Sequence, residues 1–291
     1  MSFLTYPLLR FAAFVLRILA RLQGRITSSP DDTFYLESRD KGRAIQIHIY
    51  KSSHSSGPCP VLLNLHGSGF VIPGHGSDDR FCRLVSQSTP YTVLDIRYRL
   101  APESPFPAAL NDLEDVVKWV LRQPTRYDLS RVAISGFSAG ATLALAAASC
   151  LFPASTFRHL VAFYPLVDFT DLDTKRPPDP SGNPIPIFVL RLFKWCYLQS
   201  GEDARDPRIS PIFAQPESFP TSTMTVTAAR DCLALEGEAL EAKLQKQLTG
   251  RHVSLRMDSC DHAWDKTALD NTPEADARDK AYKQVLQLLL E

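Results

Sequence analysis

The chain has 291 residues, of which 44% are hydrophobic and 22% are charged, as in ordinary globular proteins. Lysines plus arginines and aspartates plus glutamates both number 32, so the formal net charge is zero and no basic field favours nucleic acid. The six cysteines are scattered without a C-x-x-C pair, which indicates reduced thiols in a cytoplasmic protein rather than a disulfide framework or a zinc site. The length favours one large domain over two independent ones.

The first predicted element is an amphipathic helix over residues 3–22. Arg10, Arg17 and Arg21 interrupt its apolar sequence, and their spacings place them on one helical face. A bilayer span needs about 20 uncharged apolar residues, which this segment does not offer. Two interpretations follow: a lid helix packed over an active site, or an amphipathic helix on a membrane surface.

Strand and helix patterns then alternate along the chain. Alternating isoleucines at positions 45, 47 and 49 predict a half-exposed strand. Apolar runs predict buried strands over residues 61–65, 92–97, 131–134, 160–163, 223–228 and 252–257. Helical patterns cover residues 108–122, 141–150, 234–248 and 274–290. This alternation predicts an α/β fold with a mostly parallel central sheet and helices on both faces.

The pattern breaks between residues 171 and 205. Five prolines in the first part of this segment precede an aromatic-rich stretch that contains Phe188, Phe193 and Trp195. Irregular segments of this length inside a compact domain are usually functional. We therefore expect these aromatic side chains to lie close to a ligand.

Gly136-Phe137-Ser138-Ala139-Gly140 fits the pattern G-x-S-x-G between a predicted strand and a predicted helix. This context is that of a nucleophile elbow, in which a strained serine pushes its hydroxyl out of a sharp turn. Gly136 and Gly140 keep the strand and the helix from colliding, because a Cβ at either position would clash. Ser138 is therefore the predicted nucleophile.

Four strings of residues carry a resemblance to a known family. They are Tyr98-Arg99-Leu100-Ala101-Pro102-Glu103, Phe163-Tyr164-Pro165, Asp206-Pro207-Arg208-Ile209-Ser210-Pro211 and His66-Gly67-Ser68-Gly69. The last is similar to the H-G-G-G oxyanion motif of α/β-hydrolases, with Ser68 in place of a glycine. From about residue 45 to the C-terminus, the chain resembles the hormone-sensitive-lipase-like family of that superfamily, the class IV esterases that include the arylacetamide deacetylases.

The resemblance implies an oxyanion hole formed by the amides of Ser68, Gly69 and Ala139. His66 and Gly67 would then support the loop, with His66 orienting it rather than acting as the base. A serine at position 68 would be disfavoured if that position required a positive φ. Its hydroxyl would stand beside the pocket.

The remaining catalytic residues follow Ser138 in the order acid, then histidine, which this fold uses. Ala229-Arg230-Asp231-Cys232-Leu233 resembles the family's G-x-D-x-L acid loop, so Asp231 is the predicted acid. His262 follows the last predicted strand and is the predicted general base. Phe137 replaces the acidic residue that this family usually carries after the first glycine of the elbow.

The resemblance also implies an α/β-hydrolase fold as a single domain over residues 1–291, with a helical lid from about residues 1–30 and 171–205. We therefore favour the lid interpretation for the first helix. The predicted pocket residues are aromatic: Phe70, Phe137, Phe188, Phe193, Trp195 and Trp264.

These features predict a serine carboxylester hydrolase that acts through an acyl-enzyme on a small-molecule ester, with no cofactor and no metal. Two alternatives stay open. One is a hydrolase or dehydratase of a natural-product pathway, acting on one elaborate substrate. The other is a non-catalytic receptor on the same fold. The sequence also leaves open a homodimer, weak membrane-surface contact through the first helix, the acyl chain length and the natural substrate.

Overall fold

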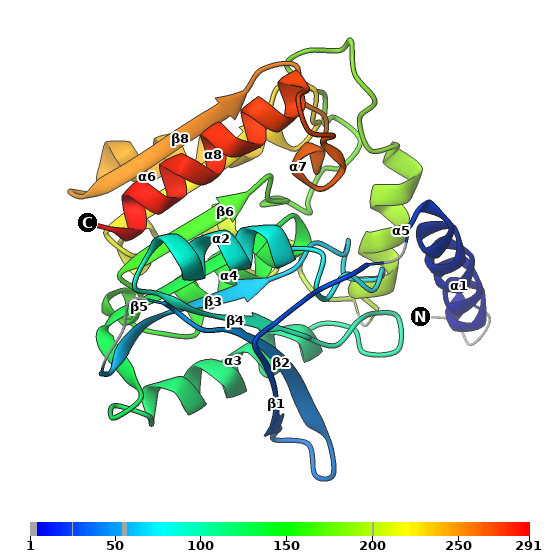
Figure 1. Ribbon diagram of the computed structural model, residues 1–291. Coiled ribbons are helices and arrows are strands. Elements are labelled where there is room, and N and C mark those ends of the chain that lie inside the picture. The colour runs from blue at the N-terminus through cyan, green and yellow to red at the C-terminus, as the bar shows by residue number, and fades with distance from the viewer. Residues whose placement is uncertain (1–4, 25, 54–56, 200) are drawn as a thin grey trace.

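An eight-stranded sheet forms the centre of the molecule in the computed structural model, which describes residues 5–24, 26–53, 57–199 and 201–291 (Figure 1). The strand order is β1-β2-β4-β3-β5-β6-β7-β8. β2 pairs antiparallel with the edge strand β1 on one side and with β4 on the other, and the pairs from β4 to β8 are all parallel. The strands are β1 (Asp32–Glu37), β2 (Ala44–Tyr50), β3 (Cys59–Leu65), β4 (Thr92–Ile96), β5 (Tyr127–Phe137), β6 (His159–Phe163), β7 (Ser222–Ala228) and β8 (Arg251–Met257).

Helices cover both faces of this sheet. They are α1 (Thr5–Gln23), α2 (Asp79–Ser88), α3 (Ala108–Leu121), α4 (Ala139–Cys150), α5 (Ile187–Tyr197), α6 (Ala234–Gln247), α7 (Trp264–Thr267) and α8 (Pro273–Leu289). Short 3-10 turns occur at Ala154–Thr156, Pro211–Phe213 and Pro216–Ser218. The apolar side chains of α3, α4 and α6 pack with one face of the sheet, and those of α2 and α8 pack with the other. The predicted mostly parallel sheet with helices on both faces is confirmed.

The central strands read as continuous apolar runs because both of their faces are covered. In β5, Val132 and Ile134 belong to one core and Ala133 belongs to the core on the opposite face. Every residue of β3 is buried. Burial on both faces is the ordinary condition of parallel strands in α/β proteins, and it explains why no polar alternation marks them in the sequence.

β1, α2 and the four-residue α7 have no counterpart among the predicted elements. β1 is an edge strand whose residues are exposed or half-buried, so it carries no apolar run that would mark it. α2 has a mainly polar sequence, and its buried residues Phe81, Cys82 and Val85 are few. Elements with little apolar surface give a weak periodic signal.

α1 and α5 lie side by side, away from the body of the sheet (Figure 1). α5 is the helical part of the irregular segment over residues 171–205. Among the described helices, none is long and apolar enough to cross a membrane.

α1 does not pack its stripe of large apolar residues against the body of the protein. Arg17 points toward the body and donates to the carbonyl oxygens of Val71 (3.0 Å) and Ala101 (2.8 Å). It also forms a two-pronged ion pair with Glu103, at 2.9 and 2.7 Å. The apolar stripe, which includes Phe11, faces away from the body and is exposed. Helical periodicity identified the two faces of α1, but it did not identify which one the body covers.

Candidate active site

Ser138 sits in a strained turn between β5 and α4. Its φ of 52° and ψ of −120° lie outside the regions that non-glycine residues normally adopt. A Cβ at Gly136 would collide with the carbonyl group of Gly140, and a Cβ at Gly140 would collide with the carbonyl group of Leu65. The two glycines therefore allow the close approach of strand and helix that this turn requires. The Ser138 amide donates to the carbonyl oxygen of Phe163 (2.8 Å), which fixes the turn to β6.

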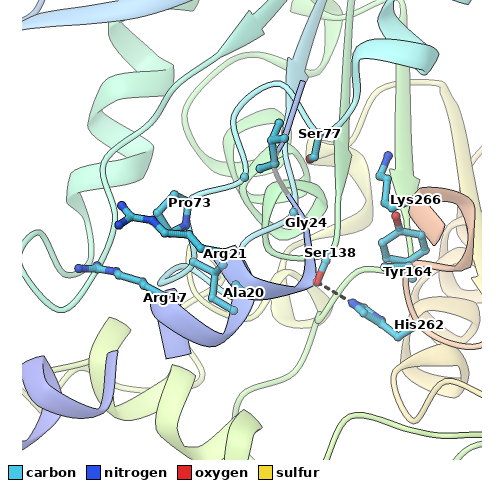
Figure 2. A pocket seen from close by; sticks show the side chains of 15 residues that line it. Arg17, Ala20, Arg21, Gly24, Pro73, Ser77, Ser138, Tyr164, His262 and Lys266 are labelled. Atoms are coloured by element: carbon cyan, nitrogen blue, oxygen red, sulfur yellow. Dashed lines mark hydrogen bonds between the residues drawn. The ribbon is translucent and has the colours of Figure 1, made fainter. Parts of the chain in front are cut away.

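Three side chains from separate loops form a continuous hydrogen-bonded chain. Ser138 Oγ lies 2.9 Å from His262 Nε2, shown by the dashed line in Figure 2. On the other side of the ring, His262 Nδ1 lies 2.6 Å from Asp231 Oδ2. Asp231 is fully buried, and its second oxygen accepts from the Leu233 amide (3.0 Å). In this geometry an imidazole can take a proton from the hydroxyl while the carboxylate fixes its tautomer.

The position of His262 depends on neighbours that the sequence patterns did not single out. The ring of Tyr164 and the imidazole pack edge to face at a centroid distance of 4.8 Å. Tyr164 itself has a positive φ of 39° and donates its hydroxyl to the buried carboxylate of Asp265 (2.7 Å). The next residue after the histidine, Ala263, is left-handed with a φ of 58°. Tyr164 lies within the Phe163-Tyr164-Pro165 string, so the sequence could indicate that it lies near the site. It could not indicate that Tyr164 contacts His262.

His66 is packed as a structural residue. Its ring stacks on Tyr98 at a centroid distance of 4.4 Å, and its Nδ1 lies 3.1 Å from the Gly67 carbonyl oxygen. Burial lowers the pKa of His66 to about 4, so the imidazole is neutral near pH 7. A Cβ at Gly74 would collide with Gly67 and His66, which shows how tightly the following loop covers this turn.

Ser68 does not need a positive φ, and its hydroxyl does not take the expected place. The positive φ in this loop falls on Gly69 (53°) and Phe70 (63°), not on Ser68. The Ser68 hydroxyl also does not stand beside the cavity. It accepts from the Phe70 amide (2.8 Å) and contacts the Tyr98 hydroxyl (2.7 Å), which in turn donates to the His66 carbonyl oxygen (2.6 Å). The Ser68 hydroxyl therefore holds the loop together through its bonds to the Phe70 amide and to Tyr98, on the side away from the cavity.

The loop brings unpaired backbone amides close to the serine. A Cβ at Gly67 would lie 3.6 Å from Ser138 Cβ, so this loop and the elbow touch. Within the described part of the chain, no acceptor is found for the backbone amides of Ser68, Gly69 and Ala139. Amides at such positions can bind an anionic oxygen.

A cavity of about 780 Å³ opens onto Ser138 and His262 (Figure 2). Its walls come from α1, from the loop that follows the oxyanion-like motif, from the elbow and from the loop after β8. The lining residues are Arg17, Ala20, Arg21, Gly24, Ile26, Gly67, Ile72, Pro73, Gly74, Ser77, Ser138, Tyr164, His262, Ala263 and Lys266. The volume is within the range of small-molecule sites.

The six aromatic residues predicted to line the pocket are not among these lining residues. Phe188 and Trp195 of α5 are exposed, while Phe70, Phe137 and Trp264 are buried in the core, and Phe193 packs between α1 and the body. Aromatic side chains were expected at the cavity because of their apolar area, but here that area stabilises the packing of the loops behind it.

Phe137 does not line the cavity, but it contacts Lys266, which does. The Lys266 ammonium lies 3.4 Å from the centroid of the Phe137 ring, and forms ion pairs with Asp78 (2.7 Å) and Asp265 (2.9 Å). Burial opposes the charge of Lys266, but the carboxylates of Asp265 and Asp78 raise its pKa above the ordinary value. A half-buried lysine, held by two carboxylates, thus packs on the aromatic ring of Phe137, the residue that replaces the family's usual acid after the first elbow glycine.

Ligand atoms of His48, His75 and Asp95 lie within 4.8 Å of one another, a set that could hold a metal ion. Burial lowers the pKa of His75 to about 3, together with the neighbouring histidines. None of these three residues is among those that line the cavity at Ser138. They therefore lie outside the walls of this cavity.

Comparison with known proteins gives a consistent result. A family model described as an alpha/beta hydrolase fold matches residues 62–265. An ethyl acetate hydrolase of Pseudomonas putida is 28% identical over 221 residues, which are 72% of this chain and 68% of that protein. The carboxylic ester hydrolase LipN of Mycobacterium tuberculosis is 32% identical over 227 residues, which are 73% of this chain but only 58% of that protein.

Solved structures share the architecture over almost the whole chain. The carboxylesterase EstE1, cloned from a metagenomic library, has a TM-score of 0.78 at 26% identity, covering 98% of this chain and 97% of that one. A Pyrobaculum calidifontis esterase has a TM-score of 0.77 at 23% identity, covering 99% and 98% of the two chains. At that identity the second likeness shows the fold alone. With the family model covering more than half of its length, the chain belongs to the α/β-hydrolase family, in the hormone-sensitive-lipase-like branch that its sequence motifs indicate.

Proposed function

We propose that the protein is a serine carboxylester hydrolase that acts through an acyl-enzyme. The observation that carries this proposal is the hydrogen-bonded chain Ser138–His262–Asp231 at the wall of the cavity. The relatives named as ester hydrolases support the same reaction class. A receptor on this fold would have no need of a complete nucleophile, base and acid.

The reaction begins when Ser138 Oγ attacks the ester carbonyl while His262 Nε2 takes its proton. Asp231 holds the ring so that Nε2 faces the serine, and its charge stabilises the imidazolium that forms. The carbonyl oxygen becomes an oxyanion, which the amides of Ser68, Gly69 and Ala139 bind. One such donor contributes about 3 kcal/mol to the transition state. His262 then gives the proton to the leaving alcohol, and water repeats the sequence to release the acid.

The substrate we infer is a short- to medium-chain or small aromatic ester. A cavity of about 780 Å³ supports a small molecule rather than a polymer. Relatives include the ethyl acetate hydrolase of Pseudomonas putida and an arylesterase of Saccharolobus solfataricus, which is 28% identical over 200 residues. The six free cysteines favour a reducing compartment such as the cytoplasm.

We also propose that α1 and the segment over residues 171–205 act as a lid on the single domain. Arg17, Ala20 and Arg21 of α1 line the cavity. From α5, the ring of Phe193 packs so closely on Gly69 that a Cβ there would collide with it. The two segments therefore touch both the cavity wall and the proposed oxyanion loop.

A second candidate is an ester hydrolase of a natural-product pathway. A versiconal hemiacetal acetate esterase of Aspergillus parasiticus is 34% identical over 102 residues, which are 35% of this chain. This candidate uses the same residues and differs only in the size of the alcohol part of the substrate.

Hydrolysis of a panel of p-nitrophenyl esters from acetate to octanoate, beside a set of natural-product acetates, tests the proposal. The wild type should hydrolyse the short esters, and Ser138→Ala should reduce the rate to the level of the uncatalysed reaction plus a small residue. If the wild type hydrolyses no ester, or if Ser138→Ala keeps the wild-type rate, the proposal is wrong. A preference for an elaborate acetate would favour the second candidate.

A further inference from the structure

We propose that the exposed face of α1 is a docking surface for an anionic lipid bilayer, on which the helix lies in the plane of the interface. This surface, here called the α1 stripe, consists of large apolar residues along one side of the helix. They are Leu8, Phe11, Phe14, Val15, Ile18, Leu19 and Leu22. The inference concerns where the protein binds and does not depend on the reaction proposed above.

The α1 stripe is too apolar to be an ordinary solvated helix face. Leu8, Phe11 and Leu22 are 66%, 65% and 77% exposed. Single exposed apolar residues are common on protein surfaces, but a continuous row of seven on one helix marks an interaction site. The residues recur at intervals of three and four, so they lie on one side of the helix.

The packing of α1 fixes this side outward. The inner side buries Ala13 and partly buries Leu9 and Leu16 against Val71 and Phe193. Rotating the helix to bury the α1 stripe would break the bonds from Arg17 to Glu103 and to two carbonyl groups. The exposed apolar face is therefore a consequence of specific polar contacts on the opposite face.

The charge of α1 selects a lipid surface over a second copy of the chain. The helix contains three arginines and no acidic residue. Glu103 pairs closely with Arg17 and more distantly with Arg10 (3.9 Å), so one carboxylate faces two arginines, and Arg10 and Arg21 are exposed. Two copies of α1 packed stripe to stripe would bring these positive charges together, whereas anionic headgroups would attract them. Arginines along one edge of a stripe of Phe and Leu are the pattern of a helix that lies on a membrane.

The neighbouring helix α5 adds exposed aromatic side chains at the same end of the molecule. α5 packs against α1 (Figure 1) and carries the exposed aromatic residues Phe188 and Trp195. Tryptophan is enriched at membrane–water interfaces. The inner side of α1 meanwhile lines the cavity through Arg17, Ala20 and Arg21. A bilayer on the α1 stripe would therefore lie close to the mouth of the cavity, where esters that partition into lipid are concentrated.

Flotation of the full-length protein with vesicles tests this inference. Vesicles of phosphatidylcholine with about 30% phosphatidylglycerol are compared with vesicles of phosphatidylcholine alone. The test variant carries Phe11→Gln, Leu19→Gln and Leu22→Gln, which keep good helix formers on exposed positions and should not unfold the protein. The matched control carries Leu235→Gln, Leu269→Gln and Leu290→Gln, three exposed leucines on other elements.

We expect the wild type and the control to float with the anionic vesicles, more weakly with the neutral ones. The test variant should lose about tenfold or more of its partition coefficient. All three proteins should keep the same rate on p-nitrophenyl acetate in solution, so a failure of docking is separate from a failure of the proposed reaction. The inference is overturned if the wild type does not float, or if the test variant floats as well as the control. It is also overturned if the wild type is a dimer that only the test variant dissociates, because the α1 stripe would then be a self-interface.

Discussion

Ser138, His262 and Asp231 come from three loops, so each can be changed without removing a strand or a helix. We expect Ser138→Ala, His262→Ala and Asp231→Asn each to lower kcat by about 10⁴-fold, because the hydroxyl, the base and its orienting acid act as one unit. Steady-state kinetics together with circular dichroism checks that the fold is kept. The assignment of the base is wrong if His262→Ala turns over normally while His66→Ala does not.

Ser68 gives a prediction that separates the side chain from the backbone. Because the Tyr98 hydroxyl donates to the His66 carbonyl, the Ser68 hydroxyl must donate to Tyr98 while accepting from the Phe70 amide. Ser68→Ala leaves that buried amide without its acceptor, and should destabilise the protein by about 1–3 kcal/mol. The substitution leaves the backbone amide of residue 68 in place as the proposed oxyanion donor. The value of kcat/KM for p-nitrophenyl acetate should therefore stay within about tenfold of the wild type.

Urea denaturation and kinetics of Ser68→Ala, Tyr98→Phe and the double variant form a double-mutant cycle that tests this prediction. The stability losses of the two single variants should not add, because both belong to one relay of hydrogen bonds. A fall in rate of about 100-fold without loss of stability would instead mean that the hydroxyl itself contacts the reacting group.

At the scale of the element, Arg17 joins α1 to the body and lines the cavity. Arg17→Gln removes the ion pair with Glu103 and should loosen this wall, so KM for p-nitrophenyl esters should rise by about threefold to tenfold with little change in kcat. Arg39→Gln is the matched control, since Arg39 pairs with Glu114 and Asp115. Neither of these partners lines the cavity. Equal KM values for the wild type and Arg17→Gln would show that α1 does not shape the substrate site.

The contact between β7 and α6 predicts a dependence of stability on pH. Glu241 is buried and accepts hydrogen bonds from Thr223 (2.5 Å) and Thr225 (2.7 Å). Burial raises the pKa of Glu241 to about 7, although these hydrogen bonds lower it. The folded state therefore binds a proton more tightly than the unfolded state. The resulting stabilisation is complete below the unfolded pKa of about 4.5 and is lost as the pH rises to about 7.

Glu241→Gln cannot ionise, so it should gain stability relative to the wild type between pH 5 and pH 8. The gain should be on the order of 2–3 kcal/mol, as measured by urea denaturation at the two pH values. A difference between the two proteins that does not change with pH would contradict the raised pKa of this carboxyl group.

At the scale of the whole molecule, the sequence predicted those features that follow from local chemistry. Glycines are required at positions 136 and 140 because strand and helix backbones touch there. The turn around Ser138 could therefore be identified from the sequence. The buried strands could be predicted because their runs of apolar residues are short and continuous. The order of the strands in the sheet depends on crossover connections, which no local pattern encodes.

The features that failed share a physical cause. Apolar patterns indicate which face of an element avoids water, but not what covers that face. The sequence shows that α1 has an apolar stripe, but not that the bonds of Arg17 hold another face of the helix against the body. Phe137 and Trp264 were expected at the cavity, yet they are buried beside it. Their positions depend on contacts between segments far apart in the sequence.

The central claim is that Ser138 is a nucleophile activated by His262 and Asp231. Labelling with a fluorophosphonate, followed by digestion and mass spectrometry of the peptides, tests it most directly. Attack of the serine oxygen on phosphorus releases fluoride and leaves a phosphonylated residue that cannot turn over. We predict one adduct, on Ser138, with complete loss of ester hydrolysis, and slow labelling in His262→Ala. An adduct on another residue, or full hydrolytic activity without any adduct, would contradict the account.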